Sequence, residues 1–347
     1  MNKLHLLLPG DLNAATGGTL YDRRIVEGLR GLGWGVSVMC LDPSFPIPTA
    51  TALTDAAQAL ANIDDGARVL IDGLALGAMP DQVAPHRDRL RLIALVHHPL
   101  SLETGLEADL AAALHRSETA ALRHVRRVIV TSPSTAKRVL GLGVAATEID
   151  VIEPGTDPAP LATGSGPGPI RLLCVGTLTP RKGHLLLIDA LTGLRDLDWR
   201  LTCAGSLERS PDTTVALRRR IDVAGFNGRV RLLGEVPHRE MAALYDSADL
   251  FVLPSLFEGY GMAYAEALAR GLPVLGSRAG AIPDTVPEDA GLLVEPGSTI
   301  ALAAALEHLM KDADLRARLA AGARRARTRL PTWEDRACRF AEALADV

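Results

Sequence analysis

The amino-acid sequence predicts a doubly wound α/β fold, arranged as two successive Rossmann-like domains. Short, uniformly apolar runs alternate with helical patterns along the whole chain. This pattern is typical of parallel strands that helices cover on both faces. A stretch rich in Gly, Pro and Ser interrupts it at 153–169, which marks a domain boundary. The length of 347 residues also exceeds what a single hydrophobic core normally serves.

The first domain is expected to span residues 1–157. Its strands are predicted at 4–8, 35–40, 68–72, 90–96 and 126–131. Helical patterns separate them at 20–32, 52–62 and 105–123. In "TSPSTAKRV", Ser132 stands directly before Pro133, which indicates a helix with a serine cap and a proline in its first turn.

The second domain is expected to span residues 168–330. Its strands are predicted at 170–176, 200–205, 229–234, 249–254 and 272–277, and a long helical stretch at 298–329. A last helical segment, 332–347, follows Pro331 and is expected to return to the first domain. Two domains of this kind would face a central cleft between the carboxyl ends of their strands, where such sheets bind ligands.

The composition of the chain bears on which partners, membrane contacts and metal sites are expected. With a net charge of −4, nothing in the overall composition suggests nucleic acid as a partner, and no Lys/Arg-rich run suggests a strong membrane anchor. No apolar run approaches the ~18 residues that cross a bilayer, although weak peripheral membrane contact stays compatible with the sequence. No CxxC or HxxxH spacing occurs, so a reduced, cytoplasmic protein without a metal site is expected.

The segment "FEGYGMAYAEAL" holds Glu258 and Glu266 on either side of a glycine-rich loop, and a helix is predicted to begin near Met262. Gly259 and Gly261 would let backbone N–H groups point outward, beside the positive end of that helix. Such a place suits a pyrophosphate, and the two glutamates could accept hydrogen bonds from hydroxyls on both sides of it. The pattern therefore suggests a nucleotide sugar. The plain alternative is one glutamate at a helix start and one on a solvated helix face.

A second feature, "GTLTPRKGH", places Arg181 and Lys182 in a turn between a strand and a helix. Two cations there could stabilise the negative charge that develops on a departing phosphate. A solvated basic turn is the alternative for this segment taken alone.

The first half offers weaker signals. Gly17 and Gly18 end a loop that runs into a predicted helix, which allows close backbone approach to a ligand but also fits an ordinary turn. His97 and His98 stand at the carboxyl end of a predicted strand. Adjacent strand residues point to opposite faces, so only one of them is expected at a site, and a structural histidine is the alternative.

Together these segments resemble the retaining family-4 glycosyltransferases of GT-B fold, over nearly the whole chain. "FEGYGMAYAEAL" followed by "GLPVLGS" matches the E-x7-E signature, and "GTLTPRKG" matches the family's phosphate-binding turn. "VIEPGTD", "GGTLYDRRIVEGLRGLG" and "ALVHH" match the end of the first domain, the glycine loop and the strand with a site histidine, which aligns with His97.

The resemblance implies roles for these positions. Glu258 would bind hydroxyls of the donor sugar, Glu266 the ribose, and Lys182 the departing diphosphate. His97 would contact the donor sugar. The backbone positions implied in donor binding are Gly17, Gly18, Gly259, Tyr260, Gly261 and Met262. Of these, Gly17 and Gly18 would approach the diphosphate or the acceptor from the first domain.

One departure concerns the basic turn. Thr177 follows the glycine where the family commonly has arginine. Arg181 is the candidate that would supply the missing charge.

The expected activity is that of a retaining, metal-independent glycosyltransferase of hexosyltransferase type. Its co-substrate would be a nucleoside-diphosphate sugar, with a UDP-sugar favoured over a GDP-sugar, and it would need no other cofactor. The acceptor would be a small molecule or a glycan of unknown identity, and the oligomeric state stays open. The alternatives are another GT-B enzyme, such as a sugar-nucleotide epimerase, or a non-catalytic subunit that binds nucleotide sugars.

Overall fold

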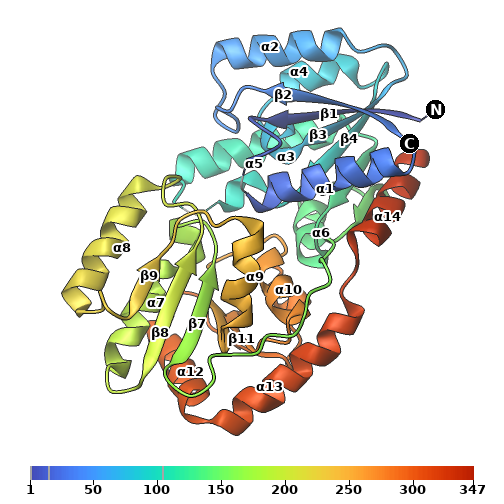
Figure 1. The fold of residues 1–347 in the computed structure, drawn as a ribbon. Helices are drawn as coiled ribbons and strands as arrows, with labels where there is room; N and C mark the ends of the chain where they lie inside the picture. The colour runs from blue at the N-terminus through green and yellow to red at the C-terminus, as the bar shows by residue number, and fades with distance from the viewer. Residues whose placement is uncertain (1, 15, 104) are drawn as a thin grey trace. The chain divides into compact units, whose positions relative to one another are not determined.

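The computed structural model describes residues 2–14, 16–103 and 105–347. The chain divides into two compact units (Figure 1). Unit 1 comprises residues 1–155 and 331–347, and unit 2 comprises residues 156–330. Each unit is built on one six-stranded sheet with parallel pairing and flanking helices. The predicted doubly wound α/β class is therefore confirmed.

The sheet of unit 1 has the strand order β2-β1-β3-β4-β5-β6. The strands are β1 (Lys3–Pro9), β2 (Gly35–Leu41), β3 (Arg68–Asp72), β4 (Arg91–Val96), β5 (Arg127–Val130) and β6 (Ile149–Val151). The first five match the predicted apolar runs to within about two residues at their ends, the usual fraying between assignments. β6 was not predicted, because it has three residues with an aspartate in the middle and too short a pattern to show a period.

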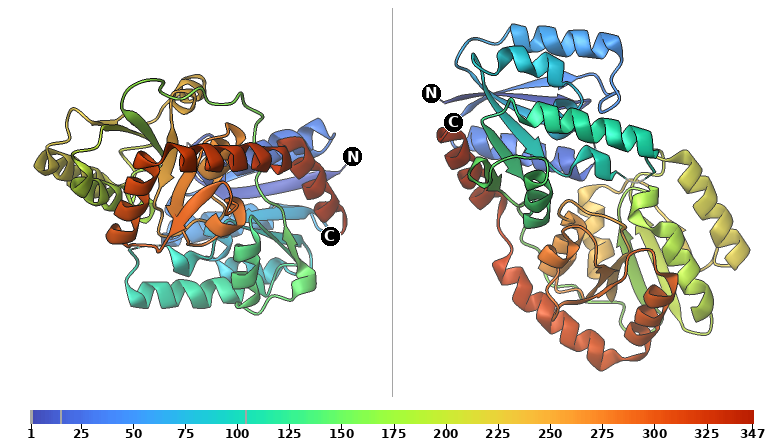
Figure 2. Two further views of the ribbon diagram at one scale, coloured as in Figure 1. Left: turned by 90° about the horizontal axis from the view of Figure 1, so that it is seen from below. Right: turned by 180° about the vertical axis from the view of Figure 1, so that it is seen from behind.

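Helices cover both faces of this sheet. They are α1 (Gly17–Gly31), α2 (Ala50–Ala61), α3 (Gly73–Leu76), α4 (Pro80–Val83), α5 (Ala108–Leu122), α6 (Pro133–Leu140) and α14 (Trp333–Ala345). Apolar residues of α1 and α14 form one core cluster, while α2, α3 and α5 contribute to the cluster on the other face. The helices on the two faces of the sheet can be seen in Figure 1 and, from behind, in the right-hand view of Figure 2. Ser132 caps α6, as predicted, by accepting from the Thr135 amide.

The segment after Pro331 packs within unit 1. α14 lies alongside α1 (Figure 1), and Phe340 and Leu344 are fully buried. The two helices approach closely at Gly28, where an added Cβ would lie 2.4 Å from the Cβ of Ala337. Arg68 on β3 donates a hydrogen bond of 2.8 Å to the carbonyl of Leu344. The last helix is therefore an integral part of the core of unit 1.

The sheet of unit 2 has the order β12-β11-β10-β7-β8-β9. Its strands are β7 (Ile170–Val175), β8 (Trp199–Ala204), β9 (Val230–Leu232), β10 (Leu250–Leu253), β11 (Val274–Ser277) and β12 (Gly291–Val294). Its helices are α7 (His184–Leu191), α8 (Pro211–Ala224), α9 (His238–Asp246), α10 (Met262–Ala269), α11 (Ile282–Thr285), α12 (Thr299–Lys311) and α13 (Ala313–Ala326). β12 is a further strand that the sequence did not predict.

One helix prediction in unit 2 was wrong. The stretch 298–329 was expected to be a single helix, whereas the structure has α12 and α13. Asp312 separates them, because it ends α12 and its side chain accepts from the amide of Leu315 at 2.7 Å to cap α13. An aspartate competes for backbone hydrogen bonds and favours helix caps over helix interiors.

The strand orders locate the functional edge of each unit. In unit 2 the first strand, β7, lies between the second and the fourth, β8 and β10. In unit 1 the equivalent reversal of strand order lies between β1 and β3. Ligands of open parallel sheets bind at the carboxyl ends of the strands beside such a switch point.

Among the helices of the described residues, none has both the length and the apolar character needed to span a bilayer.

Candidate functional site

The loops after β7 and β10 bring the two strongest sequence motifs together at the switch point of unit 2. Lys182 Nζ lies 2.6 Å from Glu258 Oε1, and Arg181 Nη1 lies 3.2 Å from Glu258 Oε2. Arg181 also donates to the carbonyl of Phe257 at 2.8 Å, and Ser255 Oγ donates to Glu258 Oε1 at 2.6 Å. Glu258 is only 5% exposed. We refer to Arg181, Lys182 and Glu258 as the basic triad.

The charge balance of the basic triad is positive. Burial acts to raise the pKa of Glu258, but Lys182 and Arg181 outweigh it and hold that pKa below its ordinary value. Glu258 is therefore ionised at neutral pH, and two cations share one carboxylate. The sequence assigned the cations to a phosphate and Glu258 to sugar hydroxyls. The structure shows that the three side chains also hold one another.

Three glycines in left-handed backbone conformations keep these loops close. At Gly183 (φ +71°) an added Cβ would lie 2.2 Å from the carbonyl oxygen of Pro254. At Gly280 (φ +55°) it would lie 2.2 Å from the carbonyl oxygen of Glu258. Gly261 (φ +93°) precedes α10 and faces the ring of Tyr264. A side chain at Gly183 or Gly280 would push the loops apart, and one at Gly261 would collide with the Tyr264 ring. Gly261 was among the predicted site residues, whereas Gly280, which lies on a loop distant in the sequence, was not.

The helix predicted near Met262 begins at that residue. Just before it, Tyr260 is 8% exposed and its carbonyl accepts from Thr285 Oγ1 at 2.7 Å. Of the two loop glycines, Gly261 has a positive φ and Gly259 does not. Thr285, which lies outside the segment 257–268, therefore helps to fix the backbone turn that leads into α10.

Glu266 lies within α10 and is oriented by residues that the sequence analysis did not identify. Tyr245 donates its hydroxyl to Glu266 Oε2 at 2.8 Å. Arg270 lies over the Tyr245 ring, 4.3 Å from its centroid, and donates to the Glu266 carbonyl. Burial, together with the nearby Glu266 carboxylate, raises the pKa of Tyr245, so its hydroxyl remains a hydrogen-bond donor. No local pattern links residue 245 to residue 266.

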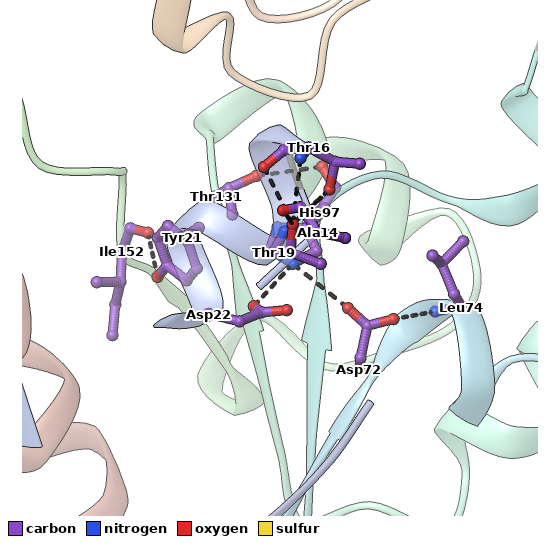
Figure 3. Close-up of polar contacts among 10 residues, drawn as sticks. All are labelled: Ala14, Thr16, Thr19, Tyr21, Asp22, Asp72, Leu74, His97, Thr131 and Ile152. Carbon is purple, nitrogen blue, oxygen red and sulfur yellow. Dashed lines mark hydrogen bonds and ion pairs between the residues drawn. The ribbon is translucent and has the colours of Figure 1, made fainter. Parts of the chain in front are cut away.

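In unit 1 the switch point holds His97 between two acidic side chains (Figure 3). His97 Nε2 lies 3.1 Å from Asp22 Oδ1 and 3.4 Å from Asp72 Oδ2. Tyr21 packs edge-on against the imidazole, with ring centroids 5.4 Å apart. His98 lies instead beside Glu103, at 3.3 Å. We refer to Asp22, Asp72 and His97 as the acidic triad.

The acidic triad favours a charged imidazole. Burial acts to lower the pKa of His97, but Asp22 and Asp72 outweigh it and raise the pKa to about 10. Burial raises the pKa of Asp22, against the opposing influence of His97. Asp72 is oriented by the amide of Leu74, which donates to its other oxygen at 2.8 Å. Asp72 was not among the predicted site residues, although its position at the end of a predicted strand was a usable signal.

Gly17 and Gly18 are placed differently from the prediction. They were expected to end a loop, but they are the first two residues of α1, which Thr16 caps. Neither has a positive φ. An added Cβ at Gly18 would lie 3.5 Å from the imidazole of His97, so this glycine lets the helix start close to the acidic triad.

Two groups in the described part of the chain have donor atoms close enough to hold a metal ion. They are the acidic triad and a set of Cys174, His184 and Cys203, each with its donor atoms within 4.8 Å of one another. No metal site was predicted from the sequence, because its Cys and His residues show no ligand spacing. Both groups join residues from separate strands and helices, which spacing cannot reveal.

Comparisons with known proteins agree with this architecture. Residues 69–160 match the family model described as Glycosyltransferase Family 4, and residues 162–326 match the one described as Glycosyl transferases group 1. An MMP alpha-(1->4)-mannosyltransferase of Mycolicibacterium hassiacum is 28% identical over 306 residues, 84% of this chain and 73% of that protein.

A D-inositol 3-phosphate glycosyltransferase of Corynebacterium glutamicum is 36% identical over 150 residues, 42% of this chain and 36% of that protein. The match thus spans about a third of that relative's length.

Solved structures show the same fold. Sucrose-phosphate synthase from Thermosynechococcus elongatus aligns over 100% of this chain and 99% of its own, with a TM-score of 0.85 and 23% identity. HepE of Anabaena, solved with UDP and glucose, aligns over 99% and 100%, with a TM-score of 0.78 and 21% identity. With two matching family models and two sheets of the same kind, the chain belongs to the family-4 glycosyltransferases of GT-B fold.

Proposed function

We propose that this enzyme is a retaining glycosyltransferase that uses a nucleoside-diphosphate sugar and no catalytic metal ion. The basic triad carries the proposal, because it places two cationic side chains at the switch point of unit 2. A diphosphate leaving group needs charge stabilisation of this kind as the sugar bond breaks. Cationic side chains can supply it in place of a metal ion.

We assign donor binding to residues of unit 2. The start of α10 directs its positive end toward the loop that holds Glu258. In our assignment, Glu258 accepts from donor-sugar hydroxyls and Glu266 from the ribose. The solved complex of Anabaena HepE with UDP-glucose, a protein of the same fold, supports a UDP-sugar as the first donor to test.

In the proposed reaction, the acceptor hydroxyl attacks on the face from which the diphosphate departs. Lys182 and Arg181 stabilise the developing negative charge, and Glu258 fixes the direction of both cations. His97 supplies a charged hydrogen-bond donor for a sugar hydroxyl. The pKa of about 10 makes it unsuitable as a general base at neutral pH, because its proton is retained.

The first experiment is a thermal-shift screen against UDP-, GDP- and ADP-sugars, since a bound ligand raises the apparent stability by mass action. The best donor is then incubated with acceptors, beginning with D-inositol 3-phosphate and short mannosides, after the names of two relatives. We expect release of the nucleoside diphosphate that depends on the acceptor, and NMR should show retention at the anomeric carbon.

Each alternative predicts a different result. Donor binding without turnover for any acceptor would indicate a binding subunit. Conversion of the nucleotide sugar to its epimer would indicate an epimerase. Inversion at the anomeric carbon would disprove the proposed stereochemistry while leaving a glycosyltransferase.

A further inference from the structure

A second cluster of chemistry-bearing side chains lies in the core of unit 2. Cys174 on β7 and Cys203 on β8 are register partners on adjacent strands. His184, the first residue of α7, faces the same place. The three side chains are 0%, 2% and 2% exposed. Their donor atoms, two sulfurs and one ring nitrogen, lie within 4.8 Å of one another.

The buried ring nitrogens of His184 distinguish this cluster from ordinary apolar packing. Among the described residues, neither buried ring nitrogen of His184 has a hydrogen bond to an oxygen or nitrogen atom, and the Cys174 thiol is the group that interacts with the imidazole. A buried polar group without a partner costs about 1–3 kcal/mol and calls for an explanation. The two cysteine sulfurs lie within 4.8 Å of a ring nitrogen of His184, and a thiol is only a weak hydrogen-bond partner.

We propose that Cys174, Cys203 and His184 form a buried site for a thiophilic divalent cation, with zinc as the natural candidate. Two thiolates and a neutral imidazole are typical zinc ligands. On binding, each cysteine loses one proton, so one Zn²⁺ and two thiols give a complex with no net charge and two released protons. A neutral complex suits this surrounding, because an unpaired charge in an apolar core is costly.

Metal binding should be weaker at low pH, since protons compete for the thiolates.

The position links the cluster to the basic turn. His184 is separated from Lys182 only by Gly183, whose left-handed backbone fits against Pro254. A metal bound to His184 would tie the start of α7 to β7 and β8. The proposal itself concerns binding and does not rest on the proposed glycosyl transfer.

The test uses the full chain with the exposed cysteines removed, Cys40→Ser and Cys338→Ser, after metal has been stripped. Co²⁺ is titrated as a spectroscopic probe and then displaced by Zn²⁺. We expect one equivalent of Co²⁺, with thiolate-to-metal charge-transfer absorption, and a higher melting temperature with Zn²⁺. Cys203→Ala in the same background should abolish both signals.

Two variants keep the result decisive. His184→Leu fills a similar space without the unpartnered nitrogens. Its metal-free form should be at least as stable as the parent, and its Co²⁺ affinity should fall by roughly tenfold or more. His97→Gln should leave the thiolate absorption unchanged, because it alters only the acidic triad.

Absorption without thiolate bands would place the cobalt elsewhere and overturn the proposal. So would an affinity that His184→Leu and Cys203→Ala leave unchanged in folded protein, as judged by circular dichroism. A disulfide between Cys174 and Cys203 in the isolated protein, found by mass spectrometry and resistant to mild reductant, would also contradict it.

Discussion

The switch points of the two units have opposite charge patterns on similar architecture. In unit 2, two cations flank one buried carboxylate. In unit 1, two acidic side chains flank one histidine. Both groups stand at carboxyl ends of parallel strands, where the fold brings loops together. The topology thus decides where a site forms, and the side chains decide which chemistry it serves.

The central residues of the two triads, Glu258 and His97, are also held in opposite charge states. Glu258 is held ionised by its neighbours, with its pKa lowered. His97 is held protonated by its neighbours, with its pKa raised to about 10. Each central residue therefore keeps its charge at neutral pH, which suits positioning and electrostatic stabilisation better than proton transfer.

The largest effect is expected for Lys182→Ala. A cation beside the leaving diphosphate acts more on the transition state than on the ground state. We expect kcat to fall about a hundredfold or more, the equivalent of ~3–4 kcal/mol at comparable electrostatic sites, with a smaller rise in the donor KM. Steady-state kinetics of donor turnover measure both. Lys311→Ala, which alters an exposed ion pair on α12, is the matched control, and an equal loss there would refute a specific role.

His97→Gln tests the acidic triad through stability. It leaves two acidic side chains without their cation, and breaking a buried pair costs about 3 kcal/mol or more. Because the folded pKa of about 10 exceeds the ordinary 6.5, the stabilisation is complete below pH 6.5 and lost as the pH rises through 10.

The measurement is the free energy of unfolding by urea for both proteins across that range. We expect the difference between them to shrink from pH 6.5 to pH 10. A difference independent of pH would show that His97 contributes by packing alone. His98→Gln provides the neighbouring control.

The two glutamates should have separable effects. Glu266→Gln weakens the acceptor for the ribose, and we expect free nucleoside diphosphate to bind roughly tenfold less tightly. Glu258→Gln removes a negative charge from the basic triad, so binding of the free nucleotide should be retained or strengthened while turnover is lost. Isothermal titration and kinetics distinguish the two. Equal losses of nucleotide affinity would end this division of roles.

Arg181→Ala should reduce kcat by at least about tenfold, because Thr177 supplies no charge in the same turn. Arg181→Lys should restore part of the rate, because it keeps the positive charge but lacks the planar guanidinium. Arg325→Ala removes an exposed ion pair with Asp289 and serves as the control. If Arg181→Ala keeps its kcat while Lys182→Ala loses it, Lys182 is the cation that stabilises the leaving diphosphate and Arg181 has no such role.

The smallest effect is expected from chelation. Excess EDTA should leave donor turnover unchanged, since the proposed charge stabilisation comes from side chains. The Cys203→Ala variant should also keep its turnover, which would show that the cluster of Cys174, Cys203 and His184 takes no part in catalysis. Loss of turnover with rescue by Mg²⁺ or Mn²⁺ would show that the reaction needs a metal ion, with the acidic triad as the first place to look.

The sequence by itself determined the α/β class, most of the strands, the start of α10 at Met262 and the cap of α6 at Ser132. These features depend on apolar periodicity and on hydrogen bonds between residues a few positions apart. It also singled out Glu258, Lys182 and Arg181, because charged residues beside glycines at the ends of buried strands stand out locally.

Only the tertiary structure decided how these residues meet. It placed Lys182 against Glu258 across 76 positions, gave His97 its partners Asp22 and Asp72, and set His184 beside two cysteines from separate strands. It also placed Tyr245 on Glu266. Such contacts arise where parallel strands distant in the chain become neighbours, and burial then fixes their charges. Neither the pairing nor the burial has a signature within any short stretch of sequence.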